Sequence, residues 1–237
     1  MSEWAPKRFW TEAAVKADPD GYGVMLDGKP VRTPGKNPLT MPTRAMAEKV
    51  AAEWDAVEKT IDPRTMPVTR AANSAIEKVA PQKAAVIEML AAYGDTDLLC
   101  YRADHPEGLV ARQAKLWDPA LDWAAETLGA RLEPRTGLMP VPQSPEALAK
   151  LNAELHKFDE FQLTAVHDLV MLTSSLVLGL AATRGWQTPE YIWSLSRVDE
   201  DWQEAQWGED DEAQAAAAAR KEGFLNAVLF FELCSAE

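Results

Sequence analysis

The stretch from Phe158 to Thr183 constrains the fold of this chain more than any other part of its sequence. Its side chains are apolar almost all round a helix, which is the pattern of a central helix buried on every side. The sequence therefore predicts a helical domain built around this helix. Its longest uncharged part, Leu169 to Thr183, is shorter than the roughly 18 residues that a membrane span needs. We therefore expect no membrane insertion.

The first third of the chain has the pattern of strands and turns instead. The pair Asp27-Gly28 lies between two short extended runs, Tyr22–Leu26 and Lys29–Thr33. Such a pair is typical of a hairpin, because both turn positions must tolerate positive φ. Pro30 cannot donate a hydrogen bond to a neighbouring strand, so its strand is expected at a sheet edge.

Helices are predicted from Thr43 onward, with Thr43 as the N-cap of the first. The Pro-rich stretch 62–67 breaks the chain and is the expected domain boundary. The fold class is therefore α+β, with a small β-rich domain over residues 1–65 and a larger all-helical domain over residues 66–237. The expected helices of the second domain are 69–79, 82–93, 107–117, 118–128, one from Ser144-Pro145, the central helix, an acidic helix from Thr188-Pro189, and an Ala-rich helix after Glu209.

Composition narrows the functional classes. The formal charge of −13 argues against a nucleic-acid partner, because phosphate binding needs clustered Lys and Arg. Cys100 and Cys234 are expected to be two buried thiols in a reducing compartment. The N-terminus has neither a secretory signal nor an organelle presequence, which predicts a soluble intracellular protein.

Motifs for catalysis or metal binding are missing from the sequence. It contains no phosphate-binding Gly-rich loop. His105, His156 and His167 have no metal-ligand spacing, and His167 beside Asp168 is expected to be a satisfied core pair. We expect no cofactor and no metal ion.

Acidic residues and two tryptophans are concentrated between Ser196 and Asp210. Dense carboxylates are typical of a solvated face, whereas tryptophans are favoured at protein contacts. A cation site would need a different loop pattern, and general acid–base catalysis would need a pocket that the sequence does not reveal. Partner recognition is the favoured interpretation. The candidate residues are Asp199, Glu200, Asp201, Glu204 and Trp207.

Three residues nearer the N-terminus are further candidates. Trp54 shares a helix face with aliphatic residues, so it lies in the core, at the domain seam or at a partner contact. Arg70 and Asn73 follow the expected domain boundary, where they fix the interdomain geometry or meet a partner. The sequence leaves these alternatives open.

Several motifs together resemble one known family, from about residue 8 to the end of the chain. The motifs are Arg8-Phe-Trp10, Leu26–Thr33, Met66–Ser74, Thr96–Arg102, Trp117–Trp123, Ser174–Leu180 and the acidic segment through Trp207-Gly208. The chain resembles the assembly chaperones that bind the free alpha subunit of the F-type ATP synthase, in mitochondria and in some bacteria.

The resemblance implies a chaperone that hydrolyses nothing and keeps new alpha subunit from aggregating until the beta subunit replaces it. It also implies a small β-rich domain followed by a helical one. The family's functional acidic position corresponds to Asp199 or Glu200, and its tryptophan corresponds to Trp54. Mitochondrial members have a presequence and act in the matrix. A bacterial cytoplasmic protein, monomeric when free, is therefore expected here.

Two rival functions remain at this stage. One is a small-molecule enzyme that uses carboxylates of the acidic helix, which would require convergent titratable groups in a pocket. The other is a structural subunit that stays in the finished synthase.

Overall fold

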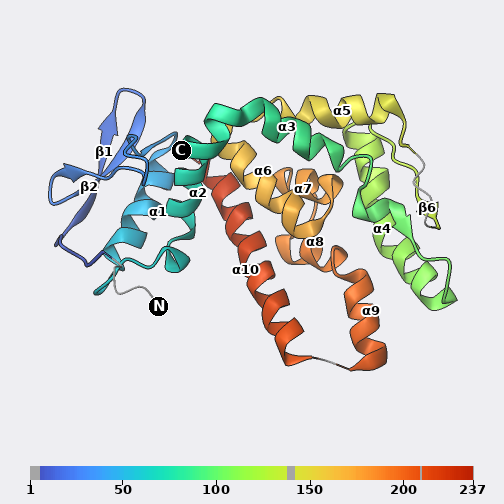
Figure 1. Ribbon diagram of the computed structural model, residues 1–237. Coiled ribbons are helices and arrows are strands. Elements are labelled where there is room, and N and C mark those ends of the chain that lie inside the picture. The colour runs from blue at the N-terminus through green and yellow to red at the C-terminus, as the bar shows by residue number, and fades with distance from the viewer. Residues whose placement is uncertain (1–5, 138–141, 209, 237) are drawn as a thin grey trace. The chain divides into compact units, whose positions relative to one another are not determined.

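The computed structural model describes residues 6–137, 142–208 and 210–236 (Figure 1). These residues form two compact units. The first takes the described residues of 1–83, 160–165 and 229–237, and the second takes those of 84–159 and 166–228. A small sheet region followed by mostly helices confirms the predicted α+β class. The boundary after residue 65 stays a prediction. The two compact units divide differently, because Met66, Val68 and Ala72 are buried in the core of the first unit.

The first unit contains a small sheet centred on one strand, β2 (Figure 1). The antiparallel partners of β2 (Gly21–Leu26) are β1 (Ala13–Asp18) along one side and both β3 (Lys29–Pro30) and β4 (Thr40–Met41) along the other. The predicted hairpin is confirmed: Asp27 and Gly28 have φ values of 46° and 78° between β2 and β3. The sequence did not predict β1. Its composition, Ala-Ala-Val-Lys-Ala-Asp, is poor in strand formers.

Helix α1 (Arg44–Asp55) covers the buried face of this sheet, and α2 (Pro67–Ser74) packs against α1. Helix α1 begins at Thr43, whose side chain accepts a hydrogen bond from the backbone N–H of Met46, as the sequence predicts. Helix α2 follows a short 3-10 turn, η1 (Pro63–Thr65). The chain then continues as a π-helical turn, η2 (Ala75–Val79), and a 3-10 turn, η3 (Ala80–Gln82).

Helices dominate the second unit, beside one short parallel strand pair. The prediction of separate helices over 107–117 and 118–128 is wrong, because α4 runs through Pro119. Trp117, Ala120 and Leu121 on both sides of this proline are buried, and their packing outweighs the hydrogen bond that proline cannot donate. The remaining elements are α3 (Lys83–Ala92), η4 (Leu98–Cys100), β5 (Tyr101–Arg102), α4 (Glu107–Thr127), β6 (Arg135–Thr136), α5 (Pro145–Leu155), α6 (Glu160–Thr173), α7 (Leu176–Thr183), α8 (Pro189–Leu195), α9 (Val198–Trp207) and α10 (Asp211–Leu233).

The predicted central helix over 158–183 is also wrong as a single element. It breaks at Ser174, whose φ is 55°, and Ser175 then caps α7 by accepting from the N–H of Leu178. Asp97 stabilises the break, because its buried carboxylate accepts from the Ser175 hydroxyl at 2.7 Å and from the N–H of Val177 at 3.0 Å. The apolar composition correctly predicted burial here, since every residue from Leu176 to Ala181 is buried.

Two further expectations need correction. The acidic helix does not begin at Pro189, since α8 ends at Leu195 and α9 is a separate helix. His167 and Asp168 are paired at 2.9 Å, but both side chains are substantially exposed and are not part of the core. Within the described residues no helix is long and apolar enough to cross a membrane.

Candidate partner-binding surface

Helix α9 is held against α4 by packing and by one hydrogen-bonded chain. The ring of Trp202 lies so close to Gly108 that a Cβ there would be 2.7 Å from the ring carbon Cη2. One turn further along α4, the Gln113 amide donates to Asp199 Oδ1 at 2.7 Å. The side-chain oxygen of Gln113 accepts from the N–H of Ala103 at 2.8 Å. Asp199 is therefore a structural link within the second unit.

Arg197 organises the other carboxylates of α9. Its guanidinium lies 2.8 Å from Glu204 Oε1, 3.6 Å from Asp201 Oδ1 and 3.7 Å from Glu200 Oε1. The Arg197 side chain is only 15% exposed, so these ion pairs are stronger than pairs on an open surface. Gln214 of α10 donates to the second oxygen of Glu204 at 2.9 Å. Glu204 thereby connects α9 to α10.

Burial raises the pKa of Asp201 above its ordinary value, opposed by the charge of Arg197 and assisted by the charge of Glu204. Arg112 of α4 lies 3.9 Å from Asp201 Oδ2 and favours the ionised form as well. Asp201 is thus a partly buried carboxylate with two cationic neighbours. These contacts position the carboxylate and favour its ionised form.

Glu200 and Trp207 are the members of the candidate set that remain largely open to solvent on α9. Trp207 is 88% exposed, more than any other exposed large hydrophobic residue in the described chain. Among the described residues, the contact that Glu200 makes is the long one to Arg197. The helix ends directly after Trp207, at Gly208 with φ 94°. Glu209, in the predicted acidic run, lies outside the described residues.

The two residues lie on the same face of α9. They are seven positions apart, which is two turns of helix and about 10 Å along the axis. We call Glu200 and Trp207 the α9 stripe. An exposed indole and a carboxylate on one helix face are typical of protein-binding surfaces, in which an aromatic side chain is buried at the centre and polar side chains surround it.

The candidates near the N-terminus belong to the other compact unit. Trp54 is half-buried and packs edge-to-face on Trp10, with ring centroids 5.2 Å apart. Asn73 is half-buried and its Oδ1 has no hydrogen-bond partner within the described part of the chain. Arg70 is exposed. Trp54 packs against the core of the first unit, and a partner contact for any of the three stays a prediction.

Three residues of α4 that are not in the candidate set hold α9 in place. Gln113 is almost fully buried, and it positions Asp199 from 86 residues away in the sequence. Gly108 leaves room for the ring of Trp202, and Arg112 lies 3.9 Å from Asp201. No local sequence pattern links either residue to α9. Among the residues that the structure describes, no three His, Cys, Asp or Glu side chains are grouped so that they could hold a metal ion.

Comparisons with known proteins agree with one another. The family model described as ATP12 chaperone protein matches residues 7–125. The crystal structure of Atp12 from Paracoccus denitrificans is 52% identical, with a TM-score of 0.94 over 98% of this chain and 100% of that one. An aspartate-to-lysine mutant of the same protein gives a TM-score of 0.95.

Two more distant proteins extend the similarity. The crystal structure of the Atu1473 protein from Agrobacterium tumefaciens is 43% identical, with a TM-score of 0.93 over 96% of this chain and 86% of that one. The mitochondrial protein atp12 of Schizosaccharomyces pombe is 23% identical over 219 residues, which are 87% of this chain and 75% of that protein. The similarity therefore includes both compact units.

Proposed function

The chain belongs to the ATP12 chaperone family of ATP synthase assembly factors, and we propose that its client is the unassembled alpha subunit of the F-type ATP synthase. In this proposal it binds alpha before the beta subunit is available, prevents alpha from aggregating, and is then displaced by beta. It acts by binding alone, with no catalytic step of its own. Its proposed place of action is the bacterial cytoplasm, in keeping with the similar solved structures from the bacteria Paracoccus denitrificans and Agrobacterium tumefaciens.

The observation that supports a protein client most directly is the α9 stripe. A tryptophan that is 88% exposed leaves a large apolar area in water. That area is removed from water only when another molecule covers it. The indole stands on a helix that contacts of Asp199, Trp202 and Glu204 hold in place, so little order of the helix itself has to be gained on binding.

The charge beside the indole suits a client that must later be released. Alpha and beta bury apolar surfaces against each other in the assembled synthase, and unpaired alpha would expose one of them. A chaperone contact that is partly polar is weaker than an obligate interface, so beta can replace it. Glu200 would increase the rate of encounter with a basic region of alpha.

Light scattering of purified alpha subunit tests the proposal directly. We expect near-equimolar chaperone to suppress the aggregation of alpha, and added beta subunit to release alpha from it. Replacement of a buried hot-spot tryptophan typically costs 2 kcal/mol or more, so Trp207→Ala should weaken alpha binding by about 30-fold. Glu200→Lys should lower the association rate, most clearly at low salt.

Two control variants separate a site from a general effect. Glu126→Lys makes the same charge change at an exposed position of α4, and Tyr101→Ala removes an aromatic ring that is 47% exposed. Neither should alter alpha binding. If Trp207→Ala and Tyr101→Ala bind alpha equally well while both remain folded by circular dichroism, the α9 stripe is not the binding site. If the parent protein does not suppress aggregation, alpha is not the client.

A further inference from the structure

Strand β1 has an open edge. It pairs with β2 along one side, and along its other side it pairs with no strand among the described residues. The carbonyl of Glu12 accepts from the N–H of Asp27 at 3.1 Å, which places the even-numbered residues of β1 in the hydrogen-bonded pairs with β2. The N–H and C=O groups of Ala13, Val15 and Ala17 therefore point away from β2, toward the open edge.

Edge strands are normally blocked against strand addition by charged side chains, by proline, by a bulge or by a covering element. In β1 the charged residues are Lys16 and Asp18, which pair with each other. The register of β1 with β2 is continuous over six residues, without a bulge or a proline. The side chains of the outward-pointing residues Ala13, Val15 and Ala17 are small and uncharged. Lys16 projects from the opposite face of the strand and lies 3.7 Å from Asp18.

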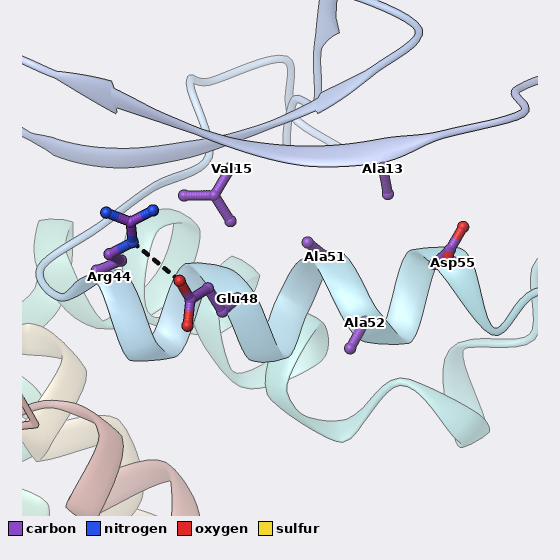
Figure 2. Close-up of a pocket in the computed structure, with 7 residues that line it drawn as sticks. All are labelled: Ala13, Val15, Arg44, Glu48, Ala51, Ala52 and Asp55. Atoms are coloured by element: carbon purple, nitrogen blue, oxygen red, sulfur yellow. Dashed lines mark hydrogen bonds and ion pairs between the residues drawn. The ribbon is translucent and has the colours of Figure 1, made fainter.

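A groove lies along the same strand. An open pocket of about 360 Å³ is lined by both β1 and α1 in the first unit. Ala13 and Val15 point into it from the strand, as Figure 2 shows. Ala51 and Ala52 line it from the helix. Because residues of a strand alternate between faces, every second side chain of a strand added next to β1 would face α1 and enter this groove.

Charge defines the ends of the groove. Glu48 lies on its rim, 2.9 Å from Arg44, as the dashed line in Figure 2 shows. Asp55 lies at the other end, 3.2 Å from Arg8, so both carboxylates that line the groove are already paired with an arginine. Glu12 and Asp20, just before and just after β1, are exposed and make no ion pair within the described chain. These two carboxylates, one beyond each end of the strand, favour a segment with Lys or Arg at its ends.

We propose that the open edge of β1 and the groove beside it bind an extended segment of the client alpha subunit by β-strand addition. The segment has apolar residues at alternate positions and a basic residue near each end. Backbone hydrogen bonds to Ala13, Val15 and Ala17 give affinity, and the groove selects the side chains. This inference rests on the proposed function for the identity of the client, but it uses a surface in the other compact unit from the α9 stripe.

Residue-resolved amide hydrogen exchange on the full-length protein tests this geometry. In the free protein the amides of Ala13, Val15 and Ala17 should exchange rapidly, while those of Ala14, Lys16 and Asp18 are slowed by β2. Addition of purified alpha subunit should slow the three outward amides by at least 10-fold. If alpha binds and these three amides still exchange rapidly, the inference is wrong while the proposed function stands.

Variants give a second readout. Val15→Pro removes one outward N–H without removing a hydrogen bond to β2, and it should weaken alpha binding by at least 10-fold. Lys16→Ala, on the opposite face, is the matched control and should bind as the parent does. If Val15→Pro unfolds the protein, Ala13→Phe fills the groove from the strand side, because Ala13 points into it in Figure 2, and should have the same effect. A folded Ala13→Phe variant with parental affinity would overturn the inference.

Two other outcomes are distinguishable. If the outward amides become protected in the free protein as its concentration rises, a second copy occupies the edge and the inference is wrong. If alpha does not bind at all, the proposed function fails, and overlapping 12-residue peptides of alpha then test the edge alone. Protection of the three amides by one such peptide would support the edge site, and protection by none would overturn it.

Discussion

Glu53 stabilises the first unit by capping a helix other than its own. This buried residue of α1 accepts hydrogen bonds from the N–H of Val68 at 2.8 Å, the N–H of Thr69 at 2.8 Å and the Thr69 hydroxyl at 2.6 Å. These two amides lie in the first turn of α2, whose own N-cap residue, Met66, provides no side-chain acceptor. The carboxylate therefore satisfies orphan donors and also interacts with the positive end of the helix dipole.

Glu53→Ala removes both carboxylate oxygens, and with them all three hydrogen bonds, and leaves two buried N–H groups without a partner. A buried donor left without a partner costs about 1–3 kcal/mol, and the costs within one site are not additive, so a loss of about 3–5 kcal/mol in the free energy of unfolding is expected. At about 2–4 °C per kcal/mol, the melting temperature should fall by about 6–20 °C. Thermal unfolding followed by circular dichroism measures this fall.

Glu48→Ala is the matched control, because Glu48 is on the same helix but exposed and forms an exposed ion pair with Arg44. Its expected cost is below about 1 kcal/mol, as for other exposed ion pairs. Glu53→Gln should fall between the two, since it keeps the shape and one acceptor oxygen. The reasoning about capping would be refuted if Glu53→Ala and Glu48→Ala melted within 2 °C of each other.

Three further predictions concern the second unit. Burial raises the pKa of Asp97 to about 6 from an ordinary 3.8, so the folded state favours the protonated acid. The stability that the protonated acid contributes is complete below pH 3.8 and is lost above pH 6. Urea unfolding should therefore show the free energy of unfolding falling by about 3 kcal/mol across this range. In Asp97→Asn the free energy of unfolding should change less with pH. Arg197→Gln should lower stability by about 1–3 kcal/mol, and thermal melts should show the difference shrinking at high salt. Gly179→Ala should cost about 1–3 kcal/mol in urea unfolding, because its Cβ would be 2.7 Å from Val170 Cγ2. Gly223→Ala, with 3.4 Å to its nearest neighbour, should instead gain about 0.5–1 kcal/mol in the same assay.

Local signals predicted the elements that depend on local chemistry. The Asp27-Gly28 turn and the Thr43 cap each depend on a few neighbouring residues, and both are present. β1 was missed because its pairing with β2, and the bonds from Thr11 and Glu12 to the Asp27 carboxylate, are not written in its own composition. The continuous helix through Pro119 was missed for a related reason, since tertiary burial outweighed a residue that usually starts helices.

The candidate surface was predictable only in part. Arg197 and Asp201 are four residues apart, a spacing that brings two side chains together on a helix, so their contact at 3.6 Å was predictable from the sequence. The bond between Gln113 and Asp199 joins residues 86 positions apart, and no spacing rule reaches that far. The dense acidic sequence also suggested more free carboxylates than exist, because Asp199, Asp201 and Glu204 are engaged within the protein.

The small size of the α9 stripe bears on how a client would be held. A stable protein–protein contact of standard size uses about 800 Å² and roughly 20–30 residues on each side. Two exposed side chains on one helix face provide an anchor and a charge, but they are far from that area. A client held by α9 alone would dissociate quickly, whereas backbone hydrogen bonds at the β1 edge would add affinity that does not depend on the same part of the client. Several modest contacts of this kind also suit release, because each can be lost in turn as the final partner subunit takes over the client surface.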